Sequence, residues 1–147
     1  MKNLILSTDS YKITHPFQYP ENMTYMHDYI ESRGGLYGYV KFFGLQYYLK
    51  EYLSKPVTME MVEEAKEICK LHGVPFNCKG WKYIAEELGY IPVKIRAVPE
   101  GAVIPNHNVL VTVESTDEKV AWITGFVETL IMKVWYPITV ATFSYKI

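Results

Sequence analysis

The sequence has little of what disulfide-rich or metal-stabilised chains use to hold themselves together. It contains 2 cysteines among 147 residues, and neither Cys69 nor Cys78 belongs to a CxxC pair. A disulfide framework and a structural zinc site are therefore excluded as the basis of the fold. We expect two simple buried thiols and a reducing compartment, the cytoplasm.

An excess of charge of one sign is also missing. The chain carries 15 Lys and Arg against 16 Asp and Glu, which gives a formal net charge of −1, and its basic residues form no cluster. A nucleic-acid-binding protein shows the opposite pattern, so we expect no nucleic-acid partner.

Long apolar runs are absent as well. The apolar stretch at residues 4–6 is too short for a signal peptide. The longest apolar region, residues 120–143, is interrupted by Glu128, Lys133 and Pro137, so it predicts a buried helix rather than a membrane span. We expect no membrane partner.

Several motifs of well-known enzyme classes do not occur. There is no GxGxxG or GxxxxGK[ST] loop to cradle a pyrophosphate, no serine-hydrolase elbow and no HExxH. The histidines lack the spacing of metal ligands, so we expect surface or turn residues and no metal site in this chain. They are His15, His27, His72 and His107.

The chain is instead rich in apolar and aromatic residues. Hydrophobic residues make up 49% of it and aromatic residues 15%, with 13 tyrosines. This composition and length predict one ordered domain over residues 1–147. Because residues 141–147 continue an apolar pattern without a stop signal, we expect this domain to be one part of a larger protein.

Hydrophobic periodicity predicts an α+β fold, with a small mixed or antiparallel sheet and several helices. Thr58 and the pair Thr116-Asp117 are expected helix caps, and Gly73 and Gly89 expected helix ends. In residues 24–32 the alternation places Tyr25, with the residues at every second position after it, on one polar-aromatic face. The expected strands are 24–32, 37–43, 93–98 and 109–113; the expected helices are 43–53, 59–71, 79–88 and 118–134, with another starting near Pro137; the expected turns are 19–22, 99–101 and 104–108.

The run TDSYKITH at residues 8–15 is the first candidate site. It gathers a carboxylate, hydroxyls, a phenol, an ammonium group and an imidazole. One interpretation is a ligand-binding wall, in which Tyr11 stacks on a planar ring and Asp9 orients a ring amide or a cation. The alternative is a short helix capped by Ser7, Thr8 or Asp9, with polar side chains as decoration.

The run ESRGG at residues 31–35 is the second candidate. Arg33, at a strand end beside two flexible glycines, is well placed to grip a phosphate with its planar guanidinium. The alternative is an ordinary surface pair between Glu31 and Arg33. We assign Trp122, Trp135 and Tyr136 to core or interface packing.

These candidate sites belong to a dense series of motifs that resembles the nicotinamide phosphoribosyltransferase family. Each motif alone is weak, but their order along almost the whole chain is specific. The motifs are STDSYKITH (7–15), QYP (18–20), ESRGG (31–35), FFGLQY (42–47), KGW (79–81), VPEG (98–101), VIP (103–105), NVL (108–110), TVESTD (112–117), ETL (128–130) and WYPITVAT (135–142).

The resemblance implies both an activity and an assembly. Family members transfer phosphoribosyl from phosphoribosyl pyrophosphate to nicotinamide, which gives nicotinamide mononucleotide and pyrophosphate in NAD salvage. They are homodimers with active sites at the subunit interface. By resemblance, Tyr11 stacks on nicotinamide from the partner subunit, Asp9 is the acidic residue nearby, and Arg33 contacts phosphates across the interface.

The resemblance also implies what this chain lacks. In this family of type II phosphoribosyltransferases, a barrel supplies the second stacking aromatic, the acids that read the carboxamide and hold Mg²⁺, and the catalytic histidine. None of these can be placed here, so we assign no catalytic residue and expect no transferase activity from the chain alone. Two hypotheses follow: an N-terminal piece of such an enzyme, or a binding and dimerisation module that pairs with a separate barrel chain or a full-length homologue.

Overall fold

The structure is a computed structural model that describes residues 3–146. It confirms the α+β class, with small antiparallel sheets and several helices. In chain order the elements are η1 (Leu4–Leu6), η2 (Ser10–Ile13), η3 (His15–Phe17), β1 (His27–Glu31), β2 (Tyr39–Lys41), α1 (Leu45–Tyr48), η4 (Leu49–Leu53), α2 (Met59–His72), α3 (Cys78–Tyr83), η5 (Ile84–Leu88), β3 (Val93–Ala97), β4 (Val103–Pro105), β5 (Val109–Ser115), η6 (Glu118–Val120), α4 (Ile123–Met132) and α5 (Trp135–Lys146).

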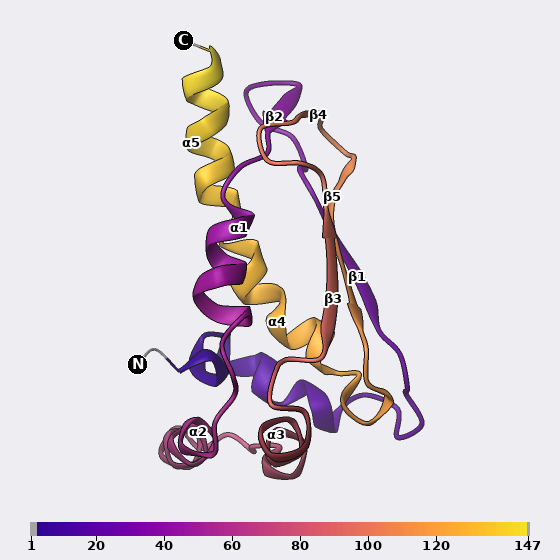
Figure 1. Cartoon of the computed structure of the whole chain (residues 1–147), viewed down its shortest axis with the longest axis vertical. Coiled ribbons are helices and arrows are strands. Elements are labelled where there is room, and N and C mark those ends of the chain that lie inside the picture. Colours follow the sequence, from indigo (N-terminus) through magenta and orange to yellow (C-terminus); the bar gives the residue numbers. More distant parts are fainter. Residues whose placement is uncertain (1–2, 147) are drawn as a thin grey trace.

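The main sheet has the strand order β1-β5-β3, and both pairings are antiparallel (Figure 1). Thr112 of β5 is the residue paired with Tyr29 on one side and with Arg96 on the other. Helix α4 packs against β1 and β5. The expected polar-aromatic face of β1 is confirmed, since Tyr25 and Tyr29 are both exposed.

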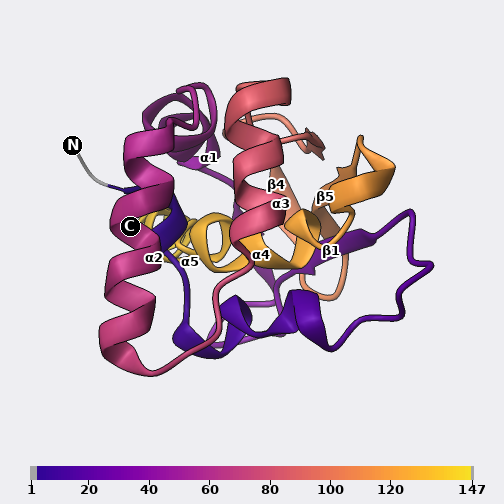
Figure 2. The same cartoon turned by 90° about the horizontal axis from the view of Figure 1, so that it is seen from below.

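A smaller sheet pairs β2 with β4 and packs against α5. At the other end of the molecule, α2 and α3 lie side by side (Figure 2). The helix signals in this region act as expected. The Thr58 hydroxyl accepts a hydrogen bond from the Met61 N–H, and Gly73 ends α2 with a left-handed φ of 77°.

Helix α4 forms the centre of the core because its apolar residues face neighbours on nearly every side. Its buried side chains include Ile123, Phe126 and Leu130. Phe126 packs edge-to-face against Trp81 of α3, with ring centroids 4.9 Å apart, and Trp122 packs against Trp81 at 5.2 Å. This aromatic triad joins α3 to α4.

Several expected elements are wrong in their bounds. Residues 104 and 105 belong to β4 rather than to a turn, which is confined to the residues after Pro105. Pro105 is compatible with a strand here because it ends an edge strand, where the missing N–H is not needed. The expected helix 118–134 is split into η6 and α4, since Ala121 and Trp122 form a tight turn between them.

Pro137 lies in the first turn of α5, which begins at Trp135. The first N–H groups of a helix have no partner inside it, so proline is tolerated there. The expected helix 43–53 begins instead at Leu45, and its second half is a π-helical turn, η4.

The turn at residues 99–101 does more than connect two strands. The Glu100 carboxylate accepts hydrogen bonds from the Gly44 N–H at 2.7 Å and the Gln46 N–H at 3.0 Å, at the start of α1. Gly44 has a φ of +101°, and a Cβ there would lie 2.5 Å from Pro137 Cγ. Three separate sequence motifs therefore meet at this point.

The tryptophans and cysteines differ in how far they are exposed to solvent. Trp122 is a core residue, as expected, whereas Trp135 and Tyr136 are exposed and so are not in the core. Cys69 is buried, and desolvation raises the pKa of its thiol, which makes it unreactive. The expectation that Cys78 is buried is wrong, since it is only half-buried at the first position of α3.

Candidate functional site

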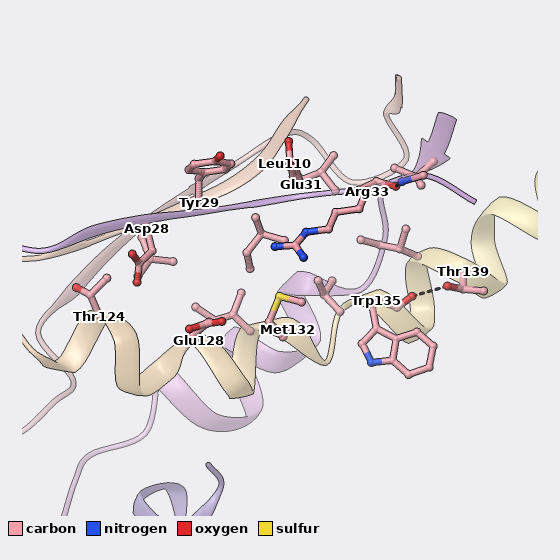
Figure 3. A pocket seen from close by; sticks show the side chains of 18 of the residues that line it. Asp28, Tyr29, Glu31, Arg33, Leu110, Thr124, Glu128, Met132, Trp135 and Thr139 are labelled. Carbon is pink, nitrogen blue, oxygen red and sulfur yellow. Dashed lines mark hydrogen bonds between the residues drawn. The ribbon is translucent and has the colours of Figure 1, made fainter. Parts of the chain in front are cut away.

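A groove of about 710 Å³ runs between β1 and the helices α4 and α5 (Figure 3). Its floor is aliphatic, and its rim carries several polar and charged groups. Asp28 and Glu128 lie at one end, the Arg33 side chain extends into the middle, and Trp135 and Thr139 lie at the other end. The lining residues are His27, Asp28, Tyr29, Ile30, Glu31, Ser32, Arg33, Gly34, Val40, Leu110, Val113, Thr124, Glu128, Ile131, Met132, Val134, Trp135, Ile138 and Thr139.

Arg33 follows directly after β1 on a loop that is tied to the turn after β4. The Ser32 hydroxyl donates to Asn106 Oδ1 at 2.9 Å, and the Ser32 carbonyl accepts from the His107 N–H at 2.8 Å. His107 adopts a left-handed φ of 65° to make this turn. The backbone just before Arg33 is therefore anchored, while Arg33 itself is exposed.

The alternative interpretation of Arg33 as one half of a surface pair is not what the structure shows. Within residues 3–146, no ion pair joins Glu31 to Arg33. A guanidinium at a groove, without a neighbouring carboxylate as partner, can bind an anion through two parallel N–H groups.

Asp9 and Tyr11 do not line the groove: Tyr11 is in η2, which contacts α4, and Asp9 is the residue before η2. Asp9 occupies the N-cap position of η2 but makes no capping hydrogen bond. Instead, it accepts a hydrogen bond from the Thr129 hydroxyl at 3.0 Å. The expected role of Asp9 as a helix cap is therefore wrong in detail, because the carboxylate bonds to α4.

The Tyr11 ring is 57% exposed. It packs edge-to-face against His15 with centroids 5.2 Å apart, and Lys12 Nζ lies 5.5 Å from its centroid. No hydrogen bond joins its hydroxyl to another residue within 3–146. An exposed ring of this kind can stack on a planar ligand.

Sequence reasoning missed a cluster of charged residues that connects these two regions. Lys12 is 5% exposed, and its Nζ lies 2.7 Å from Glu128 Oε2. Glu128 also lines the groove, together with Asp28. Only the presence of Lys12 inside the first motif signalled its importance, since Glu128 is 116 positions away.

The charges in this cluster shift one another's pKa. Desolvation raises the pKa of Asp28, and the charge of Glu128 adds to this effect. Desolvation lowers the pKa of Lys12, but the hydrogen bond and charge of Glu128 outweigh it, so the net pKa is raised. Desolvation also raises the pKa of Tyr19. Lys12 is thus held as an ammonium ion beside two carboxylates.

Other candidate chemistry is limited. Within residues 3–146, no three His, Cys, Asp or Glu side chains come together in a way that could hold a metal ion. None of the helices in the same range has the length and apolar character needed to cross a membrane.

Fold and site together define a class: an α+β domain that presents an exposed tyrosine and an exposed arginine near a central helix. Residues 3–95 match the family model described as the nicotinamide phosphoribosyltransferase N-terminal domain. The chain therefore belongs to the nicotinamide phosphoribosyltransferase family.

Curated relatives agree with this assignment. The chain is 51% identical over 148 residues to a nicotinamide phosphoribosyltransferase of Xanthomonas campestris pv. campestris, with all of this chain aligned. It is 26% identical over 162 residues to a nicotinamide phosphoribosyltransferase of Acinetobacter baylyi, with 98% of this chain aligned. In both cases the chain spans 32% of the relative's length.

Proposed function

We propose that the chain is the N-terminal part of an NAD-salvage enzyme that transfers phosphoribosyl from phosphoribosyl pyrophosphate to nicotinamide, with nicotinamide mononucleotide and pyrophosphate as products. Family membership and the printed names of both relatives support this reaction. The chain would act in the cytoplasm, and it would be inactive alone because it spans a third of these relatives.

The roles proposed for the site residues follow from what each group can do. Tyr11 stacks on the nicotinamide ring, and Asp9 is the acidic group beside it. Arg33 binds the phosphates. All three would act in trans, toward an active site completed by the second subunit of a homodimer or by a barrel chain.

One observation carries the proposal: Tyr11 and Arg33 are exposed, while residues beside them in the chain are held by hydrogen bonds or an ion pair. Thr129 fixes Asp9, and Glu128 fixes Lys12, on either side of the exposed Tyr11 ring. Asn106 and His107 hold Ser32, the residue before Arg33. Preorganised groups lose little freedom when a ligand binds, which favours recognition over simple surface decoration.

The first test measures nicotinamide mononucleotide formation by the purified chain, with both substrates and Mg²⁺. We expect no turnover above the blank, and clear turnover would overturn the proposed inactivity. The second test uses a chimera in which this chain replaces the matching third of the Xanthomonas relative. We expect an active chimera, and an assembled but inactive one would count against the proposed function.

Within that chimera, Tyr11→Ala should raise the KM for nicotinamide, and Arg33→Ala should raise the KM for phosphoribosyl pyrophosphate. Loss of a charge-assisted bidentate contact corresponds to about a tenfold or larger change. Leu71→Ala is the matched control, because this side chain is 87% exposed on α2. Equal effects of both site variants on both substrates would contradict the separate roles.

A separate binding and dimerisation module is the second candidate function. It is favoured by the exposed aromatic side chains of α5, which include Trp135, Tyr136 and Phe143. Such an apolar surface is typical of an interface. Sizing chromatography of the chain, alone and mixed with the remaining two-thirds of the Xanthomonas relative, tests it. Complex formation without restored activity would favour the module over the enzyme part.

A further inference from the structure

The central helix α4 holds the Tyr11 turn through three residues of the segment 8–12. The Thr8 hydroxyl lies 3.4 Å from the Phe126 carbonyl oxygen, the Asp9 carboxylate accepts from Thr129, and Lys12 pairs with Glu128. Thr8 and Asp9 are exposed or half-buried, whereas Lys12 is almost fully buried. The contact between Lys12 and Glu128 is part-buried, because Lys12 is shielded from solvent and the Glu128 side chain is half-exposed.

The η2 segment has few other means of holding its position. It is a 3-10 helix of four residues, and its N-cap side chain forms no capping bond. A 3-10 turn of this length has poor hydrogen-bond geometry and depends on outside contacts. Ile13 is its other buried residue. Ile13, which belongs to the hydrophobic core, and the polar contacts to α4 together hold the turn in place.

Tyr11 and Lys12 are adjacent, so the position of one constrains the other. With Lys12 Nζ held 2.7 Å from Glu128 and 5.5 Å from the Tyr11 ring centroid, the ring is directed away from α4 toward solvent. Its edge contact with His15 adds support from the same segment. If the ammonium lost its partner, it would move to water, because a buried unpaired charge is costly.

We propose that Lys12 and Glu128 are positioning residues whose ion pair sets the place and orientation of the Tyr11 ring. This inference rests on the proposed function, in which that ring stacks on nicotinamide. Neither residue touches the nicotinamide ring in this scheme. Glu128 also borders the groove that holds Arg33, so the same side chain links the two proposed binding regions.

The first arm of the test uses the purified chain and needs no activity. Proton NMR with ring-labelled tyrosine measures the nuclear Overhauser effect between the Tyr11 and His15 rings. We expect this signal to be lost or much reduced in Lys12→Met and in Glu128→Gln, and retained in Glu63→Gln. Glu63 is the matched control, since it is half-exposed and pairs with Lys66 and Lys82 on the surface of α2 and α3.

The Glu128→Gln variant is included because we expect it to stay folded: this side chain is half-exposed, and the amide keeps its size. The proposal is overturned if a folded Glu128→Gln variant keeps the Tyr11–His15 signal while Lys12→Met either keeps it too or does not fold. This arm does not depend on the reaction, so its failure is distinct from failure of the proposed function.

The second arm uses the chimera with the Xanthomonas relative. We expect Glu128→Gln to raise the KM for nicotinamide about two- to tenfold, the range of one aromatic contact, with kcat little changed. A variant with only a structural defect would contain fewer active molecules. Its apparent kcat would fall, but its KM for nicotinamide would stay unchanged.

The decisive comparison is made in the Tyr11→Ala background. If Glu128 acts through Tyr11, adding Glu128→Gln there should raise the nicotinamide KM no further, because the affected contact is already gone. Full additivity of the two changes would overturn the proposal. If Tyr11→Ala itself leaves the nicotinamide KM unchanged, the proposed function fails, and the positioning proposal loses its purpose with it.

Discussion

Trp81 provides the sharpest test of the core, because its indole is 1% exposed and packs edge-to-face on both Trp122 and Phe126. Trp81→Ala removes this ring, its two aromatic contacts and the volume it fills. Truncation of a buried aromatic to alanine costs about 3–5 kcal/mol, and edge-to-face pairs contribute to the upper part of that range. We therefore expect the free energy of unfolding to fall by about 4 kcal/mol.

The assay is urea and thermal unfolding followed by circular dichroism. For a domain of this size, about 4 kcal/mol corresponds to a decrease in Tm of roughly 10–15 °C. The near-ultraviolet signal of the aromatic triad should weaken as well. Trp135→Ala is the matched control, because this indole is 60% exposed. A loss of less than about 1.5 kcal/mol for Trp81→Ala, or an equal loss for Trp135→Ala, would refute the reasoning.

Two further predictions concern backbone geometry and charge. Gly44→Ala should destabilise the chain by about 2–5 kcal/mol in urea unfolding, because a positive φ and a 2.5 Å approach to Pro137 Cγ both oppose a Cβ. Gly38→Ala, where a Cβ would meet nothing within 4 Å, should change stability little; equal losses would contradict this explanation. Asp28→Asn should stabilise the chain at pH 7, because desolvation raises the pKa of this carboxyl and the folded state thus disfavours its charged form. The gain should shrink as the pH falls through the raised folded pKa toward the ordinary value of 3.8, and a gain that is independent of pH would show that charge is not its cause.

Local signals in the sequence determined most of the secondary structure. Thr58 and Gly73 set the bounds of α2 to within one residue, because capping and left-handed backbone are local properties. The strands at 93–98 and 109–113 also appear close to their expected bounds. The sequence did not predict that Pro105 ends a strand or that the helix expected after Asp117 is split. Strand pairing and helix continuity at these two places depend on residues far away in the chain.

For the site, the sequence by itself determined the motifs, the family and the exposed Tyr11 and Arg33 as candidates. Only the tertiary structure decided which distant groups hold them. The bond from Thr129 to Asp9 spans 120 positions and the ion pair of Lys12 with Glu128 spans 116, so no local pattern could reveal them. Chain packing alone brings the Tyr11 turn and the Arg33 groove to α4, where Glu128 pairs with Lys12 and also lines the groove.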